Sequence, residues 1–161
     1  MTTDDWENRI AALWDDDTID DQQRITHMQA LADAAPHPAL GAFELGGAYD
    51  SGGQEAEADA HYAAATRADL VTVDPDRAAR MIVQHASTLR NLGRIDEALA
   101  MLRDAPDHPA TGAAPKVFLA LALHSAGRFD EALRTAIEAV EPVLPRYRRS
   151  VSAYAEALTE E

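Results

Sequence analysis

The sequence contains no cysteine among its 161 residues, and aromatic residues make up only 6% of it. The lack of cysteine excludes disulfide bonds, thiolate nucleophiles and cysteine-ligated zinc. Few aromatic residues beside abundant alanine favour closely packed helices over a sheet, which is typically rich in aromatic and β-branched side chains. Since 47% of the residues are hydrophobic, the chain can bury a continuous core. We therefore expect one all-α domain over residues 1–161.

Basic residues are also scarce, because 14 Lys and Arg stand against 28 Asp and Glu and give a formal net charge of -14. Such a surface repels phosphate backbones and anionic lipids, so neither nucleic acid nor a membrane is an expected partner. No apolar run approaches the roughly 18 residues that span a bilayer, and the N-terminal MTTDDWENR lacks the features of a secretion signal. We expect a cytoplasmic location.

What the sequence does contain is a repeated segment. LGRIDEAL at residues 92–99 returns 34 residues later as AGRFDEAL at 126–133, and SGGQEAEA at 51–58 aligns as a third copy. In each copy a glycine is followed five residues later by an alanine, and a small residue precedes the glycine by seven. The glycines are Gly53, Gly93 and Gly127, the later alanines are Ala58, Ala98 and Ala132, and the earlier small residues are Gly46, Ala86 and Ala120.

These spacings predict two helices in each copy, joined at the glycine. A glycine at the end of the first helix can adopt the left-handed conformation without strain and so satisfy the last carbonyl groups. The acidic pairs Asp96/Glu97 and Asp130/Glu131 would then lie in the first turn of the second helix, where the helix dipole favours negative charge. Small residues at the crossing let the two helices approach closely, and one such hairpin must stack on a neighbour to bury its apolar face.

On these residues the chain resembles the tetratricopeptide repeat family, whose 34-residue unit is a pair of antiparallel helices. The first copy matches best, through Leu45, Gly46, Tyr49, Gly53, Ala58, Tyr62 and Ala65. The resemblance implies a right-handed α-α superhelix of helical hairpins, with repeats at residues 39–72, 79–112 and 113–146. Two departures stand out. The aromatic residue usual near the start of the first helix is missing in all three copies, and six extra residues at 73–78 are expected to lengthen a loop or the start of the next helix.

Further helices are predicted on both sides of the repeats. Residues 1–36 read as a degenerate N-terminal hairpin, in which Thr18 and Asp21 resemble a capping box before the second helix. Residues 146–159 read as a C-terminal capping helix. Its apolar residues Tyr147, Val151, Tyr154 and Leu158 fall at helical spacing and predict one buried face.

No pattern of catalytic or metal-binding residues accompanies the repeats. Glu57 and His61 lie four residues apart, but the HExxH motif is absent, so we interpret them as a surface pair. His85 is interpreted as an interior histidine with a hydrogen-bond partner. GxSxG elbows and phosphate-binding loops are also missing. We expect a protein that is not an enzyme, with no catalytic residue, no metal site and no cofactor.

The resemblance also implies a binding surface, because in this family the first helices of the repeats line a concave groove. Carried onto this chain, the groove positions include Leu40, Gly47, Asp50 and Ser51 in the first copy. The predicted peptide-binding set is Phe43, Arg80, Val83, Gln84, Ser87, Arg90, Asn91, Val117, Leu121 and His124. Within it, Phe43, Val83, Val117 and Leu121 are the expected apolar anchors. The family's carboxylate-clamp pattern is not reproduced, so chaperone C-termini are not predicted as ligands.

Arg80 and Arg90 would form a basic strip in an otherwise acidic protein. Guanidinium groups bind carboxylates in bidentate geometry, so the expected partner is a protein or peptide bearing an acidic side chain or a C-terminal carboxylate. The alternative is that both arginines only pair with acidic residues of adjacent helices. The sequence thus predicts a non-catalytic adaptor or scaffold.

A second hypothesis is a self-assembling structural protein that forms homo-oligomers through its terminal helices. The acidic N-terminus, with Asp4, Asp5 and Asp15–Asp17, would then contact the basic cluster Arg146–Arg149 of another copy.

Overall fold

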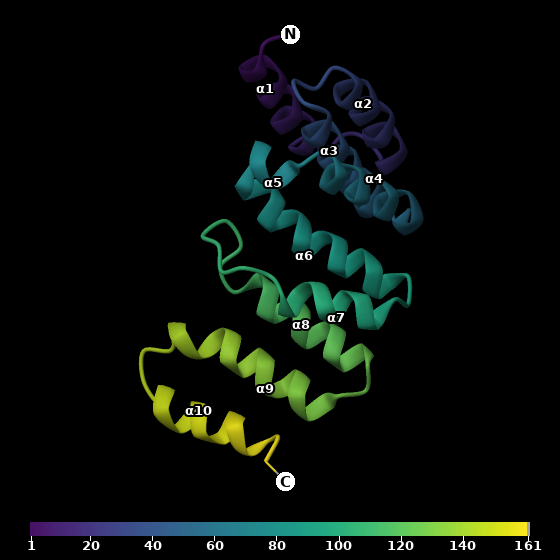
Figure 1. The fold of residues 1–161 in the computed structure, drawn as a ribbon. Coiled ribbons are helices and arrows are strands. Elements are labelled where there is room, and N and C mark those ends of the chain that lie inside the picture. Colours follow the sequence, from purple (N-terminus) through teal and green to yellow (C-terminus); the bar gives the residue numbers. More distant parts are fainter. Residues whose placement is uncertain (161) are drawn as a thin grey trace.

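The computed structural model describes residues 1–160, and every regular element in this range is helical (Figure 1). The all-α prediction is therefore confirmed. The elements are α1 (Thr3–Trp14), α2 (Asp21–Asp33), α3 (Pro38–Ser51), α4 (Glu55–Arg67), α5 (Leu70–Val73), α6 (Pro75–Asn91), α7 (Ile95–Arg103), α8 (Ala114–Ser125), α9 (Phe129–Val140), the 3-10 helix η1 (Glu141–Val143) and α10 (Arg148–Ala157). Figure 1 shows consecutive helices stacked in chain order from one end of the molecule to the other.

The three glycine turns share one backbone conformation, as predicted. Gly53, Gly93 and Gly127 have φ values of 67°, 78° and 75°. In each turn the N–H after the glycine donates to a carbonyl five residues earlier, for example from Gln54 to Tyr49 at 2.9 Å. This is the bond of a Schellman motif, which ends a helix by satisfying its last carbonyl groups. The repeated glycine therefore ends α3, α6 and α8 in the same way.

Small residues lie where the helices of a pair cross. A Cβ atom at Gly46 would stand 2.8 Å from the ring of Tyr62, so α3 can reach α4 at this distance only through glycine. In the later pairs Ala98 is fully buried and Ala132 is 7% exposed. The predicted small-residue crossings are therefore found in the buried interior.

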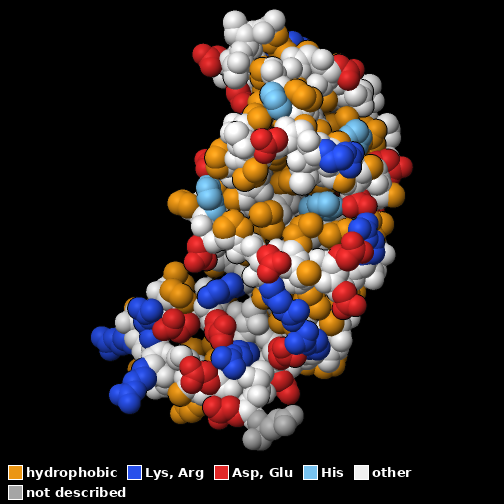
Figure 2. Space-filling model, in the orientation of Figure 1, with side chains coloured by type: hydrophobic (Ala, Val, Ile, Leu, Met, Phe, Trp, Pro, Cys, Tyr) orange, Lys and Arg blue, Asp and Glu red, His pale blue; other side chains and the backbone are white. Residues whose placement is uncertain are grey.

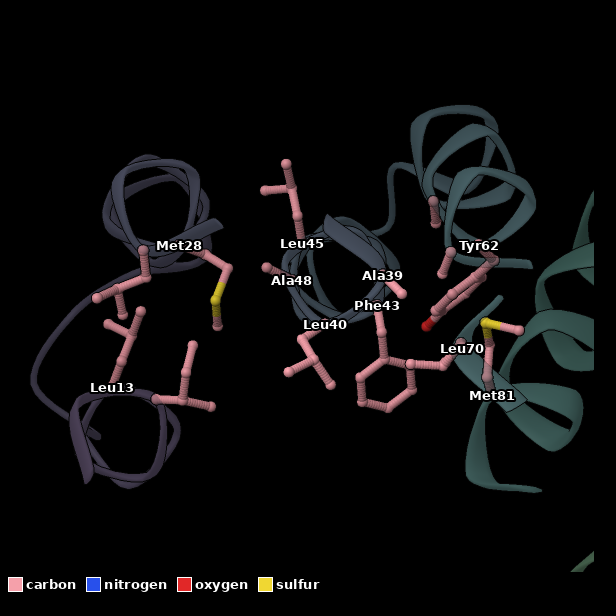
Figure 3. Close-up of a cluster of buried hydrophobic side chains, with 14 of the residues drawn as sticks. Leu13, Met28, Ala39, Leu40, Phe43, Leu45, Ala48, Tyr62, Leu70 and Met81 are labelled. Carbon is pink, nitrogen blue, oxygen red and sulfur yellow. The ribbon is translucent and has the colours of Figure 1, made fainter. Parts of the chain in front are cut away.

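The largest core lies in the N-terminal part of the molecule, with α3 at its centre. Figure 3 shows α3 between Leu13 and Met28 on one side and Tyr62 and Met81 on the other. Trp6 of α1 is also fully buried, and its indole N–H donates to the Leu31 carbonyl at 2.8 Å. The first two helices are thus part of the same core as α3 and α4.

The predicted capping box of α2 is wrong by two residues. The capping residue is Asp20, whose carboxylate accepts from the Gln23 N–H at 2.8 Å, while the Gln23 side chain accepts from the Asp20 N–H. Thr18 instead donates its hydroxyl to Asp16. Asp20 is the capping residue because it directly precedes the helix in extended conformation, which is the geometry that a capping side chain requires.

The extra residues before the second repeat form helix rather than an irregular loop. Asp69 adopts a left-handed conformation after α4 and leads into the one-turn helix α5. Asp74 then caps α6 by accepting from the Arg77 N–H at 2.9 Å, and Pro75 occupies the first helical position, where its fixed φ is favourable. Because α6 begins at Pro75 rather than at residue 79, the expected lengthening of the next helix is confirmed.

The predicted buried face of the last helix is wrong in half of its residues. Tyr147 and Tyr154 are 77% and 73% exposed, whereas Ala155 is buried and Val151 and Leu158 are partly buried. The reason is that Tyr147 has a φ of 67° and precedes α10, so it does not share the helical register of Val151. The helix packs against α9, and its less exposed side carries Val151, Ala155 and Leu158, so that both tyrosines lie outward.

Candidate functional site

The first helices of the successive hairpins, α1, α3, α6 and α8, form a common surface, which we name the first-helix face. The neighbours α3 and α6, and α6 and α8, are in direct contact. Helix α1 reaches this face through Trp14, whose indole N–H donates to Glu44 of α3 at 2.8 Å. A Cβ atom at Gly47 would lie 3.3 Å from the Trp14 ring, so the glycine gives the indole its place.

A cavity of about 430 Å³ opens on the first-helix face between α1, α3 and α6. We call it the α1–α3–α6 cavity, and its lining residues are Glu7, Ile10, Ala11, Trp14, Phe43, Glu44, Gly47, Asp50, Ser51, Arg77, Arg80 and Gln84. Three members of the predicted peptide-binding set, Phe43, Arg80 and Gln84, meet here, together with the predicted groove positions Gly47, Asp50 and Ser51. A cavity enclosed on three sides is the kind of place that holds a ligand side chain.

One wall of the cavity is an ion-pair network centred on Arg77. Its guanidinium binds Glu7 of α1 at 2.6 Å, Glu44 of α3 at 2.8 Å and Asp74 at 2.8 Å. Burial alone would lower the pKa of Arg77, but hydrogen bonds to the three carboxylates raise it above its ordinary value. Through these ion pairs Arg77 links α1, α3 and the start of α6.

Arg77 was not in the predicted set because it lies within the six extra residues at 73–78, outside the repeat positions from which the groove was derived. Its partners Glu7 and Glu44 are 70 and 33 residues away in the chain, a separation that helical periodicity does not reveal. The local signal was the segment Asp74 to Arg77, in which both the backbone N–H and the guanidinium of Arg77 bind the capping carboxylate.

Arg80 and Arg90 differ from Arg77 in having no carboxylate partner. Within residues 1–160 neither arginine has a carboxylate oxygen within 4.0 Å. The Arg80 guanidinium lies over the Phe43 ring at 5.8 Å, and the Arg90 guanidinium donates to the side-chain oxygen of the neighbouring Asn91 at 3.4 Å. The alternative that both arginines are used up by acidic residues of adjacent helices is therefore contradicted.

Two residues with acceptor groups, Asp50 and Gln84, also line the cavity. The Asp50 carboxylate accepts from the Thr88 hydroxyl at 2.9 Å and from the Tyr62 hydroxyl at 3.5 Å. Burial raises the pKa of Asp50, against the lowering effect of these hydrogen bonds. Oε1 of Gln84 is buried and has no hydrogen-bond partner within residues 1–160.

The remaining predicted residues lie on α6 and α8, outside this cavity. Val83 is 6% exposed, and Phe43, although it lines the cavity, is 5% exposed, so these two expected anchors offer a ligand almost no surface. Val117 and Leu121 on α8 are 43% and 44% exposed and form an open apolar strip. His124 stacks edge-on against Phe129 at 5.1 Å. Ser87 and Asn91 are partly buried and exposed, respectively. The predicted set thus divides into an enclosed part and an open part, and its role in binding stays a prediction.

The histidines considered as ligands or catalysts have structural surroundings. His85 is buried, and its Nε2 lies 2.6 Å from Asp59, as expected for an interior histidine with a partner. His61 stacks in parallel on Tyr49 at 5.2 Å. In the described part of the chain no three side chains are gathered as a metal site. None of the helices described is long and apolar enough to pass through a bilayer.

Consecutive helical hairpins stacked on one another define the class of helical repeat proteins, and three of the hairpins here are closed by a glycine turn. A family model described as tetratrico peptide repeat matches residues 39–158, so the chain belongs to the tetratricopeptide repeat family. Proteins of this family are in general non-catalytic modules of protein–protein interaction. The match includes α10 but not α1 and α2. Among curated proteins no match was found.

Proposed function

We propose that this protein is a non-catalytic adaptor that binds a peptide or protein segment along the first-helix face. The observation that carries the proposal is the pair of guanidinium groups, Arg80 and Arg90, without carboxylate partners on α6. They lie about 15 Å apart along the helix axis, and in a protein of net charge -14 each forms a local site for an acidic group. An acidic side chain or a C-terminal carboxylate of the ligand would bind there in bidentate geometry.

The neighbouring surfaces supply the other contacts that such a ligand needs. The α1–α3–α6 cavity encloses one side chain of the ligand, and the exposed Val117 and Leu121 offer apolar anchors about one helix further along the face. Ser87 and Asn91 lie between these two surfaces on α6 and add polar contacts. A segment crossing from α3 to α8 would therefore meet an enclosed pocket, a basic strip and an apolar strip in turn.

Selection from a random peptide display library tests the proposal. We expect the enriched peptides to carry an acidic side chain or a free C-terminus, and the R80A/R90A variant to bind them roughly tenfold or more weakly. The matched control is R149A, which removes an exposed arginine of α10. Helical circular dichroism and the melting temperature show that each variant is folded. Equal affinity of wild type and R80A/R90A would contradict the role of these arginines.

Self-assembly through the terminal helices is a second candidate, favoured by one observation. Val143 and Tyr147 are 79% and 77% exposed beside the basic cluster Arg146–Arg149, so apolar and positive surface coincide at the C-terminal end. Association with the acidic N-terminus of another copy would be weakened by salt. Sedimentation velocity at low and at high salt tests this, and a monomer under both conditions would exclude it.

A further inference from the structure

Helix α9 leaves its apolar side open to water. Its packing against α8, α10 and η1 buries only two alanine residues of the helix. The large side chains of Phe129, Leu133 and Val140 recur at helical spacing on one side and are 59%, 51% and 51% exposed. Together with Ala136 between them, we name these residues the α9 strip.

An apolar cavity of about 320 Å³ opens beside the C-terminal half of the α9 strip. Its lining residues are Ala136, Ile137, Val140, Leu144 and Val151. In the first two repeats the position of Ala136, four residues after the crossing alanine, is filled by the buried Tyr62 and Leu102. A cavity of roughly 150 Å³ already holds a benzene ring, so this one has room for a large apolar side chain.

The negative charge of the protein lies mostly outside this region. Residues 1–127 contain 9 basic and 21 acidic side chains and residues 128–161 contain 5 and 7, so their net charges are -12 and -2. Within α9, Arg134 pairs with Glu138 at 2.8 Å, and Arg128, just before the helix, pairs with Glu131. Two copies of this acidic protein can therefore approach through α9 with little electrostatic repulsion.

The α9 strip is complementary to itself. Its four residues are spaced by four, three and four positions, an order that is the same when the helix is reversed. In two α9 helices lying antiparallel about a two-fold axis at their middle, Phe129 of one copy faces Val140 of the other, and Leu133 faces Ala136. A large side chain thus meets a smaller one, beside the cavity that Ala136 leaves. The Phe129 ring is supported for this contact by His124, edge-on at 5.1 Å.

From these observations we infer that the protein forms a two-fold symmetric dimer through the α9 strip. The partner is a second copy of this chain, and Phe129 of each copy packs at the apolar cavity of the other. The contact differs from end-to-end association of the terminal helices, because both copies use the same surface and the assembly closes at two. It also goes beyond peptide binding, since neither Arg80 nor Arg90 lies on α9.

The size of the exposed surface fits a reversible dimer. The strip and Val143, which follows it in η1 and is 79% exposed, leave on the order of 400 Å² of apolar surface in water, within the range that marks interaction sites. Two such patches bury about 800 Å² of apolar surface. Because homodimer interfaces are roughly 65% apolar, the whole contact approaches the ~1,200 Å² of the smallest specific interfaces.

Sedimentation equilibrium over a series of protein concentrations tests the dimer. We expect a monomer–dimer equilibrium without larger species, which persists at high salt because apolar contacts are not screened. Leu133→Asp places a charge in the contact of both copies and should raise the dimer dissociation constant roughly 100-fold or more. The matched control is Val71→Asp, which adds the same charge at a 65% exposed position on α5 and should leave the equilibrium unchanged.

Phe129→Ala keeps the test valid if Leu133→Asp does not fold. It only shortens an exposed side chain and should weaken the dimer roughly tenfold, with unchanged helical circular dichroism. Cross-linking then tests the symmetry. Because the chain has no cysteine, Ala136→Cys can be joined by a short bismaleimide only to a second copy. In the two-fold arrangement both copies of residue 136 lie near the axis, so this variant should cross-link efficiently and Val71→Cys should not.

Three results would overturn the inference. The first is a monomer at all concentrations, and the second is a series of larger species that salt dissolves, which indicates end-to-end association instead. The third is a dimer that neither Leu133→Asp nor Phe129→Ala weakens. The peptide experiment stays independent, because R80A/R90A changes no residue of the α9 strip and should dimerise as the wild type does.

Discussion

The N-terminal and C-terminal parts of the molecule use different means to hold their helices together. The core around α1–α6 contains the large side chains Trp6, Phe43 and Tyr62, whereas the buried cluster around α6–α9 consists of alanine and leucine alone. The face drawn in Figure 2 also differs between the two parts: hydrophobic side chains are spread over the upper part, and lysine, arginine and acidic side chains alternate over the lower part. The same repeat pattern therefore occurs with a core of large side chains and with a core of alanine and leucine.

This difference between the two parts indicates which of them can keep a ligand cavity in a fixed shape. In the N-terminal part, the Arg77 network and large side chains fix three first helices around an enclosed space. In the C-terminal part, small residues bring the helices together, and α10 contributes a single buried residue, Ala155. Regions with little buried apolar surface open locally at lower free energy, so we expect α10 to exchange its amide protons first.

The largest effect should come from a matched pair of tyrosine truncations. Tyr62→Ala removes a fully buried ring between α3, α4 and α6, and we expect a loss of about 3–5 kcal/mol in the free energy of unfolding. Tyr154→Ala removes a ring that is 73% exposed and should change stability by no more than about 0.5 kcal/mol. Urea unfolding followed by circular dichroism measures both. A loss at Tyr154 as large as that at Tyr62 would contradict the exposed position of Tyr154.

Overpacking of the helix crossings comes next in size. Ala98→Leu should cost about 1–3 kcal/mol, because the alanine is fully buried and the two helices have no room for a larger side chain. Ala132→Leu lies in the last hairpin, where α10 gives looser cover, and should fall at the lower end of that range. The melting temperatures of the two variants rank them. Unchanged melting of Ala98→Leu would contradict its place at a tight crossing.

The glycine turns should behave alike in both regions. An added Cβ atom at Gly53, Gly93 or Gly127 meets no atom within 4 Å, so the cost of alanine there is conformational. We expect a loss of about 1–2 kcal/mol at each site, the cost of a left-handed residue with a side chain. Three clearly unequal losses in the free energy of unfolding would show that the surroundings of the turns contribute as well.

The smallest effect is a difference in pH dependence between two carboxylates. Burial raises the pKa of Asp50 in the folded state above 3.8, so its folded form holds a proton more tightly than the unfolded chain. Wild-type stability should therefore fall relative to Asp50→Asn as pH rises from about 3.8 through the raised pKa. Urea midpoints between pH 3.5 and 7, roughly spanning this window, measure the difference. A constant difference over this range would refute the assignment.

Glu131 in the last hairpin should show the opposite sign. Its hydrogen bond with Arg128 lowers its pKa below 4.5, so wild-type stability should rise relative to Glu131→Gln as pH rises toward that value. The same series of urea midpoints measures it. The slope is expected to be shallow because the pair lies at the surface, where salt and water screen it.

The sequence predicted those features that depend on local conformation. The glycine turns followed from three glycines in register, because a left-handed turn favours that residue type. The extra residues at 73–78 predicted either a longer loop or a longer start of the next helix, and the structure has the longer helix. The face of α10 was mispredicted because periodicity cannot show that Tyr147 leaves the helix. The capping of α2 was misplaced because Thr18 and Asp20 offer similar chemistry, and only the backbone conformation separates them.

The site was predicted where it follows the repeat and missed where it does not. Arg80 and Gln84 occupy regular positions of a first helix, so their place on the first-helix face followed from the pattern. Arg77 and the contribution of α1 depend on contacts between residues far apart in the chain, which no spacing encodes. Gln84 has a buried acceptor without a partner. This depends on how the surrounding helices pack and could not be predicted from the sequence either.

The ion pairs of Arg77 have a practical consequence for anyone who works with fragments. The family match starts at residue 39, yet Glu7 and Trp14 of α1 are bound to the matched part through Arg77 and Glu44. A shortened chain starting at that boundary would expose the apolar side of α3 to water, and the cavity would lose the wall that α1 forms. Expression trials and ligand screens should therefore keep the first 38 residues.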